Sequence, residues 1–139
     1  MKTITPYLLK FALSAVVLTL IFRFCLSHGI QNQSWLTIIL SSLLYFATIF
    51  SAGWYFGKKD HEHLPIFDIG FRFHFTNYVV YNIISLLWFE LGFASIYERK
   101  STIAVIAVNW GIFLLLHAVF YFWIRKRTIN GMDKDDLFE

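Results

Sequence analysis

Five polar side chains interrupt the long apolar runs of this sequence, and their chemistry is where a function would begin. They are Arg23, Asn82, Glu90, Asn109 and His117. A charge inside a segment that can cross a bilayer is costly, so such residues are usually paired or functional. We predict an Arg23–Glu90 ion pair, which would either fix helix register or tune the pKa of Glu90 for binding a proton or cation. We expect Asn82 and His117 to form a hydrogen bond, with a proton relay as the alternative.

A second group of side chains could bind a metal. His61 and His63 form an HxH pattern beside Asp60 and Glu62, and His74 follows further along. Imidazole and carboxylate groups are ligands for zinc and related divalent metals, but this spacing matches no established signature. The sequence therefore favours a solvated charged loop here, with a divalent metal as the lesser alternative and no other cofactor expected.

Composition places the chain in the membrane class. Hydrophobic residues make up 58% of its 139 residues and charged residues only 15%, whereas soluble domains carry roughly 25% charged residues. A membrane-spanning helix needs about 20 apolar residues, so four spans would use nearly the whole length. We therefore predict an all-α membrane protein in which residues 1–139 form a single polytopic domain of four transmembrane helices in an antiparallel bundle.

The apolar runs set the predicted boundaries. The first run is too long for the core of a signal peptide, so we expect it to be an uncleaved span. A link of about five residues between the last two runs makes those two spans antiparallel neighbours. We expect spans at about 5–27, 34–57, 75–97 and 102–124, a cytoplasmic loop at 58–74 and a cytoplasmic tail at 125–139.

The second run carries a stripe of small and hydroxyl side chains at three- and four-residue spacing. These residues are Ser34, Thr37, Ser41, Tyr45, Thr48 and Ala52. Membrane helices pack closely along such stripes, so we predict a helix–helix seam, with a polar pore-lining face as the alternative.

The distribution of basic residues predicts the topology. With four spans, nine basic residues lie on the side of the termini: Lys2, Lys10, Lys58, Lys59, Arg72, Arg125, Lys126, Arg127 and Lys134. Three lie on the other side: Arg23, Arg99 and Lys100. Because cytoplasmic segments carry the excess of positive charge, both termini are predicted to be cytoplasmic, in a multi-pass protein of the cytoplasmic (inner) membrane.

Function follows less directly from these patterns. The sequence contains none of the common hydrolase, metalloprotease or phosphate-loop motifs and no nucleic-acid module, so an enzyme is not the favoured class. Four short helices enclose little space, so our leading hypothesis is a homo-oligomer that forms a pathway for ions, protons or a small solute through the lipid bilayer. A non-catalytic accessory or assembly subunit of a larger membrane complex is the alternative. A metal-dependent lipid-modifying or redox enzyme using His61, His63 and His74 is the third.

Overall fold

The chain folds into four helices. The computed structural model describes residues 4–63 and 70–130, and within these ranges it contains no strand. The helices are α1 (Pro6–Gln31), α2 (Trp35–His63), α3 (Phe71–Glu90) and α4 (Lys100–Asn130). Three of them, α1, α2 and α4, are long and apolar enough to cross a membrane. The predicted all-helical fold is therefore confirmed, and three of the four expected spans are long and apolar enough to cross a membrane, whereas α3 does not meet this criterion.

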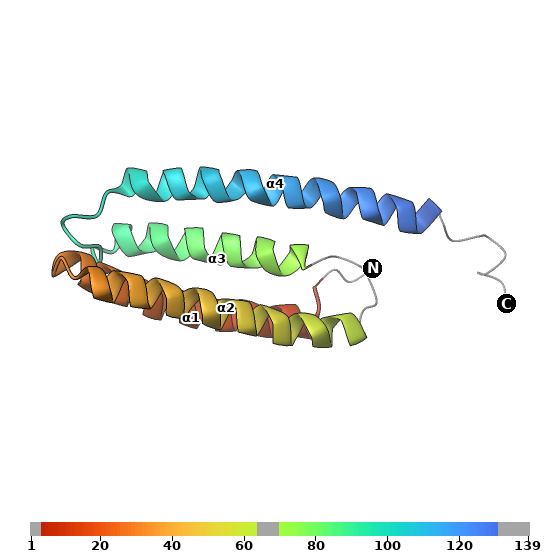
Figure 1. The fold of residues 1–139 in the computed structure, drawn as a ribbon, viewed down its shortest axis with the longest axis horizontal. Helices are drawn as coiled ribbons and strands as arrows, with labels where there is room; N and C mark the ends of the chain where they lie inside the picture. The colour runs from red at the N-terminus through yellow and green to blue at the C-terminus, as the bar shows by residue number, and fades with distance from the viewer. Residues whose placement is uncertain (1–3, 64–69, 131–139) are drawn as a thin grey trace.

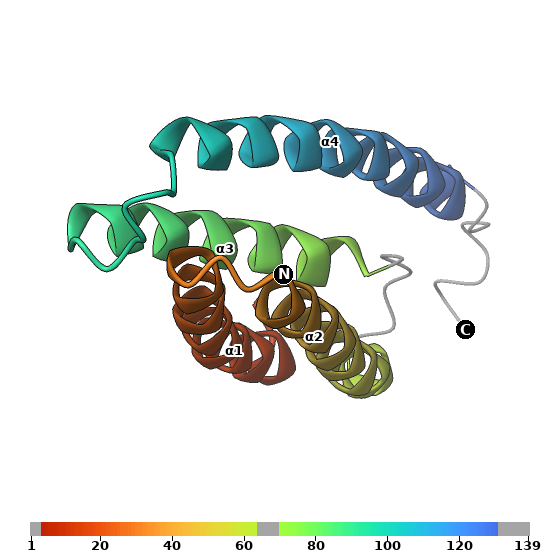
Figure 2. The same cartoon turned by 60° about the vertical axis from the view of Figure 1, so that its left-hand side comes forward.

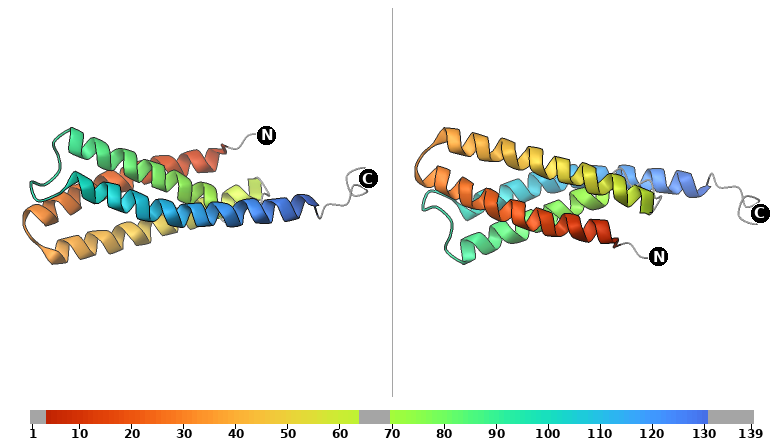
Figure 3. Two further views of the ribbon diagram at one scale, coloured as in Figure 1. Left: turned by 90° about the horizontal axis from the view of Figure 1, so that it is seen from above. Right: turned by 90° about the horizontal axis from the view of Figure 1, so that it is seen from below.

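The helices lie side by side along the long axis of the molecule (Figure 1). Figure 2 shows α1 and α2 on one side of α3 and α4 on the other. In Figure 3 the α1–α2 and α3–α4 links lie at one end, whereas α1 begins and α4 ends toward the opposite end. α1 contacts both α2 and α3, and the main contact of α4 in the described chain is with α3. The structure is thus a three-helix unit with α4 attached to its α3 side.

Local sequence signals set two of the helix ends. Thr5 caps α1, because its Oγ1 accepts the N–H of Leu8 at 3.1 Å, and Pro6 occupies the first helical position. α3 ends at a Schellman motif, in which Gly92 adopts φ 75° and donates to the carbonyl of Phe89 at 3.0 Å. Phe93 donates to the carbonyl of Trp88 at 3.0 Å and completes the motif.

The observed bounds of α2 and α3 differ from those that hydropathy predicts. α2 continues to His63, so residues 58–63 are helical although they were expected in a loop. α3 starts at Phe71 and stops at Glu90, whereas the apolar pattern suggested a span at 75–97. The reason is that Gly92 takes a left-handed conformation that terminates the helix inside an apolar run, where hydropathy gives no warning.

The buried face of α1 organises the three-helix unit. Its buried residues recur every three or four positions and change from apolar to polar along the helix: Leu8, Phe11, Ala15, Thr19, Arg23 and Ser27. At the apolar end Leu8 and Phe11 pack on Phe73 of α3, with the Phe11 and Phe73 rings 5.0 Å apart. The predicted seam on α2 faces this stripe, since Tyr45 contacts Thr19 and Ala52 packs on the apolar cluster.

At the polar end a buried ion pair joins α1 to the α3–α4 link. Arg23 is only 3% exposed, and its Nη2 donates to Oε2 of Glu98 at 2.6 Å. The other carboxylate oxygen accepts from Ser27 Oγ at 2.5 Å and from the N–H of Ser95 at 3.1 Å. The predicted Arg23–Glu90 pair is therefore wrong. Glu90 is the last residue of α3, its side chain is 62% exposed and it pairs with Lys100, because the turn at Gly92 brings Glu98 back over α1.

Besides the exposed Lys100–Glu90 pair at its first residue, α4 packs on α3 in the described chain through aromatic side chains and a hydrogen bond. Tyr78 donates its hydroxyl to the carbonyl of Ala107 at 3.1 Å, and its ring meets the Trp110 ring edge-on at 5.6 Å between centroids. Gly111 makes this approach possible, since a Cβ at that position would lie 3.2 Å from the Tyr78 hydroxyl. Further along, His117 lies against His74 with ring centroids 5.0 Å apart.

The two carboxylates at this end of the molecule should differ sharply in their effect on stability. Glu98→Ala leaves Arg23 buried without its carboxylate, so we expect a loss of about 3–5 kcal/mol in the free energy of unfolding. Glu90→Ala removes one member of an exposed pair and should cost at most about 1 kcal/mol. Thermal or denaturant unfolding of both variants in detergent checks this expectation. Equal losses for the two would contradict the assignment of Glu98 as the partner of Arg23.

Candidate functional site

A large cavity lies between α2 and α3 and is the candidate site. Its volume is about 950 Å³, which is near the upper end of the range of about 300–1,000 Å³ for small-molecule sites. Phe11 of α1 and Trp110 of α4 complete the walls that α2 and α3 form. The α2 lining comprises Tyr45, Phe46, Ile49, Phe50, Gly53, Trp54, Gly57, Lys58, Asp60 and His61. The rest comes from Gly70, Arg72, Phe73, His74 and Asn77.

Aromatic side chains of α2 line the apolar part of the cavity. Phe46, Phe50 and Trp54 follow one another at four-residue spacing, which places them on one face of the helix. Their rings stack in sequence, with centroids 6.2 Å and 6.4 Å apart. Gly57 continues the stripe without a side chain, and a Cβ there would meet no atom within 4 Å. The missing side chain at this position contributes to the open volume.

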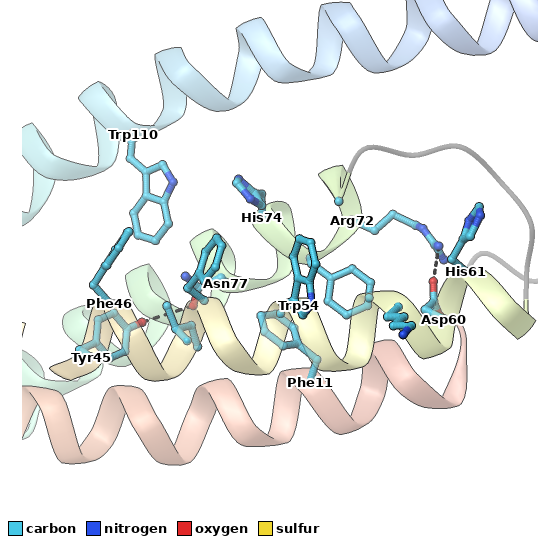
Figure 4. A pocket seen from close by; sticks show the side chains of 17 residues that line it. Phe11, Tyr45, Phe46, Trp54, Asp60, His61, Arg72, His74, Asn77 and Trp110 are labelled. Carbon is cyan, nitrogen blue, oxygen red and sulfur yellow. Dashed lines mark hydrogen bonds and ion pairs between the residues drawn. The ribbon is translucent and has the colours of Figure 1, made fainter. Parts of the chain in front are cut away.

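The polar end of the cavity is built around Asp60. This residue is 1% exposed, accepts from the Thr5 hydroxyl through one carboxylate oxygen and binds Arg72 through the other. Three elements therefore meet at one carboxylate: the cap of α1, the last turns of α2 and the first turn of α3. Figure 4 shows Asp60, His61 and Arg72 gathered at this end, with Tyr45, Phe46 and Trp110 at the other.

A second polar contact joins the walls toward the end of the cavity that holds Phe46 and Trp110. Tyr45 of α2 donates its hydroxyl to Oδ1 of Asn77 on α3 at 3.3 Å. The Thr19 hydroxyl of α1 lies 3.1 Å from the same Tyr45 oxygen. This chain of three side chains links α1, α2 and α3, so the spacing between α2 and α3 is fixed both here and at Asp60.

The five intramembrane residues singled out from the sequence do not converge on this cavity. Arg23 is held by Glu98, and Glu90 lies exposed at the end of α3. Asn82 donates to the carbonyl of Tyr78 at 2.8 Å and Asn109 to that of Val105 at 2.8 Å, so both amides bond within their own helices. His117 packs on the rings of His74 and Phe71, and the expected hydrogen bond between Asn82 and His117 is not formed.

The histidines of the predicted metal cluster are partly placed. His61 and His74 both line the cavity, and the side chain of His63 lies outside the described part of the structure. Among the residues described, no group of three or more histidine, cysteine, aspartate or glutamate side chains is arranged to hold a metal ion. Asp60, which the sequence grouped with these histidines, instead forms the ion pair with Arg72.

Two features of the site were missed in the sequence. The four-residue spacing of Phe46, Phe50 and Trp54 was visible, but an aromatic stripe on an apolar helix reads equally well as a lipid-facing surface. The pairing of Asp60 with Arg72 was hidden because the boundary of α2 was placed before Asp60. Had the helix been extended to His63, Asp60 would have stood on the helix face that carries Phe56 and Tyr45 rather than in a solvated loop.

Comparison with known proteins adds no assignment, since no family model, curated protein or solved structure matches this chain.

The Asp60–Arg72 pair can be tested by a double-mutant cycle. Arg72→Met leaves the buried Asp60 carboxylate without its cation and should cost about 3–5 kcal/mol of unfolding free energy, whereas Asp60→Leu leaves only the partly exposed Arg72 and should cost less. The double variant removes both charges and should be more stable than Arg72→Met alone. Glu62→Leu serves as the control, because Glu62 is exposed in the same helical turn. Additive losses in the double variant would show that Asp60 and Arg72 do not depend on each other.

Proposed function

We propose that this chain is a small multi-pass membrane protein that binds one amphipathic, lipid-like molecule in the cavity between α2 and α3. The observation that carries the proposal is the division of a cavity of about 950 Å³ into an aromatic part and a charged end. An apolar chain against Phe46, Phe50 and Trp54 would be removed from water, while a polar group could stay at the end that holds Asp60 and Arg72. The bound molecule would be the small solute of the pathway hypothesis.

The proposal includes a membrane arrangement of four antiparallel spans with both termini cytoplasmic. α1, α2 and α4 meet the length and hydropathy that a span requires. α3 is less apolar, but it lies between α1 and α4 and buries Asn77 and Ser85, so it needs less lipid-compatible surface than its neighbours. The excess of basic residues on the side of the termini supports the cytoplasmic orientation in the inner membrane.

The outer surface of the helices supports the same placement. Large apolar side chains stay exposed along the helices, among them Leu43 and Leu44 on α2 and Phe113, Leu115 and Phe120 on α4. A soluble monomer rarely exposes contiguous apolar surface of this extent, whereas lipid chains cover it without cost.

An ion or proton pathway is the second candidate. It is favoured by buried polar groups in the α1–α2–α3 interface, where Thr19 and Tyr45 meet and where Arg23 Nε and Ser85 Oγ lack a partner among the described atoms. The apolar contact of Phe11 with Phe73 separates these groups from Asp60, so conduction would require that contact to open. We therefore place ligand binding first. Self-association, the accessory-subunit role and the metal-dependent enzyme remain predictions from the sequence alone.

Filling the cavity tests the proposed function. Gly57→Phe should place a ring in open space, so binding of a fluorescent hexadecyl-chain probe should weaken by at least about ten-fold. Ala47→Phe adds the same ring to the same helix at an exposed position that does not line the cavity, and its binding should equal that of the unaltered chain. The measurement is energy transfer from tryptophan to the probe in neutral detergent.

The melting temperatures of both variants decide how the binding result is interpreted. If Gly57→Phe is folded and binds the probe as well as Ala47→Phe does, the cavity is not a ligand site and the proposal is wrong. Proton flux in proteoliposomes addresses the second candidate, which requires that the purified chain alone dissipate an imposed pH gradient.

A further inference from the structure

We propose that the charged end of the cavity selects an anionic headgroup, and that the ligand is an anionic phospholipid drawn from the surrounding bilayer. This inference rests on the proposed function, since it specifies the class of the molecule that the cavity would hold. It is carried by three observations: the charges of the described cavity lining, their position near the end of α2 and the exposure of the aromatic wall.

The described residues of the lining carry more positive than negative charge. Among them, Lys58 and Arg72 contribute two positive charges and Asp60 one negative charge. Both carboxylate oxygens of Asp60 already accept hydrogen bonds, from Thr5 and from Arg72. The charges of Asp60 and Arg72 therefore compensate each other within the protein, and among the described lining residues Lys58 supplies the charge that a ligand would meet. His61 and His74 line the same cavity and add positive charge whenever they are protonated.

Helix dipoles do not reverse this preference. The C-terminal turns of α2, which favour cations, and the N-terminus of α3, which favours anions, meet at this end of the cavity. Their effects have opposite sign and similar size, so they largely cancel. The charged side chains consequently decide which headgroup is preferred.

The position of these charges fits a lipid headgroup. Lys58 is exposed and lies near the end of α2, where the proposed span reaches the cytoplasmic interface. Basic side chains at a cytoplasmic interface attract anionic lipid. The headgroup of a lipid would lie beside Lys58, and its chains would extend along the aromatic wall toward Phe46 and Trp110 (Figure 4).

The aromatic wall also indicates that the ligand comes from the bilayer. Phe46, Phe50 and Trp54 line the cavity, yet they are 67%, 61% and 72% exposed. These rings therefore belong both to the cavity and to the outer surface of α2, and the two surfaces are continuous. In the proposed orientation a lipid chain could move from the bilayer to the cavity along α2 without crossing water.

The chain offers a matched pair of variants for testing this inference. Lys58 lines the cavity, whereas the adjacent Lys59 does not and has its Nζ 4.7 Å from the centre of the Tyr55 ring. Lys58→Gln and Lys59→Gln remove the same charge one residue apart. Lys58→Arg keeps the charge and serves as the conservative control.

The experiment measures lipid binding to the purified full chain by native mass spectrometry. Phosphatidylglycerol and phosphatidylcholine with identical chains compete in equal amounts. We expect the unaltered chain, Lys59→Gln and Lys58→Arg to prefer phosphatidylglycerol, and Lys58→Gln to lose about five-fold of that preference while binding phosphatidylcholine as before. Inorganic phosphate at constant ionic strength should not displace the lipid.

Other outcomes overturn the inference in distinguishable ways. Equal binding of the two lipids, with Gly57→Phe abolishing both, leaves the ligand site in place and removes the headgroup preference. An equal loss of preference in Lys58→Gln and Lys59→Gln assigns the effect to general surface charge. Displacement by inorganic phosphate identifies a soluble anion as the occupant, and a lipid-free dimer identifies a second copy of the chain. Unchanged lipid binding in Gly57→Phe removes the cavity site and the proposed function together.

Discussion

The carboxylate of Asp60 is the interaction on which the cavity depends. It holds the Thr5 cap of α1 and Arg72 of α3 at the end of α2, and so fixes how far apart α2 and α3 lie at that end. The hydrogen bond between Tyr45 and Asn77 also fixes the distance between α2 and α3, nearer the middle of these helices. Between the two contacts α2 and α3 do not close on each other, because α1 packs beneath both and carries Phe11 up to Phe73. The cavity is therefore kept open by the polar contacts of Asp60 and of Tyr45 and by the apolar packing of α1 against α3.

The far wall of the cavity is attached differently. α4 makes its main contact with α3, through the Tyr78 hydroxyl, the Trp110 ring and the His74–His117 contact. The ion pairs of Asp60 and of Arg23 lie in the three-helix unit and its links and do not involve α4 in the described residues. The ion pair that does join α4 to α3 in the described chain, Lys100–Glu90, is exposed, and an exposed pair contributes less to stability than a buried one. Of the cavity walls, the one that carries Trp110 is thus the easiest to move.

The sequence was sufficient for the class of fold but not for the pairing of charges. Apolar runs and the low charge content correctly predicted helices that can cross a membrane, and the hydroxyl stripe of α2 predicted a helix–helix seam, which the structure forms with α1. The partner of Arg23 was missed because hydropathy alone extended the third helix beyond Gly92, which placed Glu90 within the helix and Glu98 just beyond it. Because the left-handed Gly92 ends α3, Glu98 pairs with the buried Arg23, whereas Glu90 is exposed. Asp60 was missed for the opposite reason, since a charged segment was taken as a loop although α2 continues through it.

The positions of the acidic groups bear on the choice between conduction and binding. In the described residues the carboxylates, Asp60, Glu62, Glu90 and Glu98, all lie near helix ends, and the middle of the three-helix unit holds hydroxyl and amide groups such as Tyr45 and Asn77. Hydroxyl and amide groups can orient a polar ligand, but they carry no charge to replace the hydration of an ion or to store a proton at neutral pH. In the proposed membrane orientation, carboxylates near the two interfaces with hydroxyl and amide groups between them are the arrangement expected where a lipid headgroup is held at one surface and its chains lie within the bilayer. The same arrangement presents an ion with a barrier at the centre of its path.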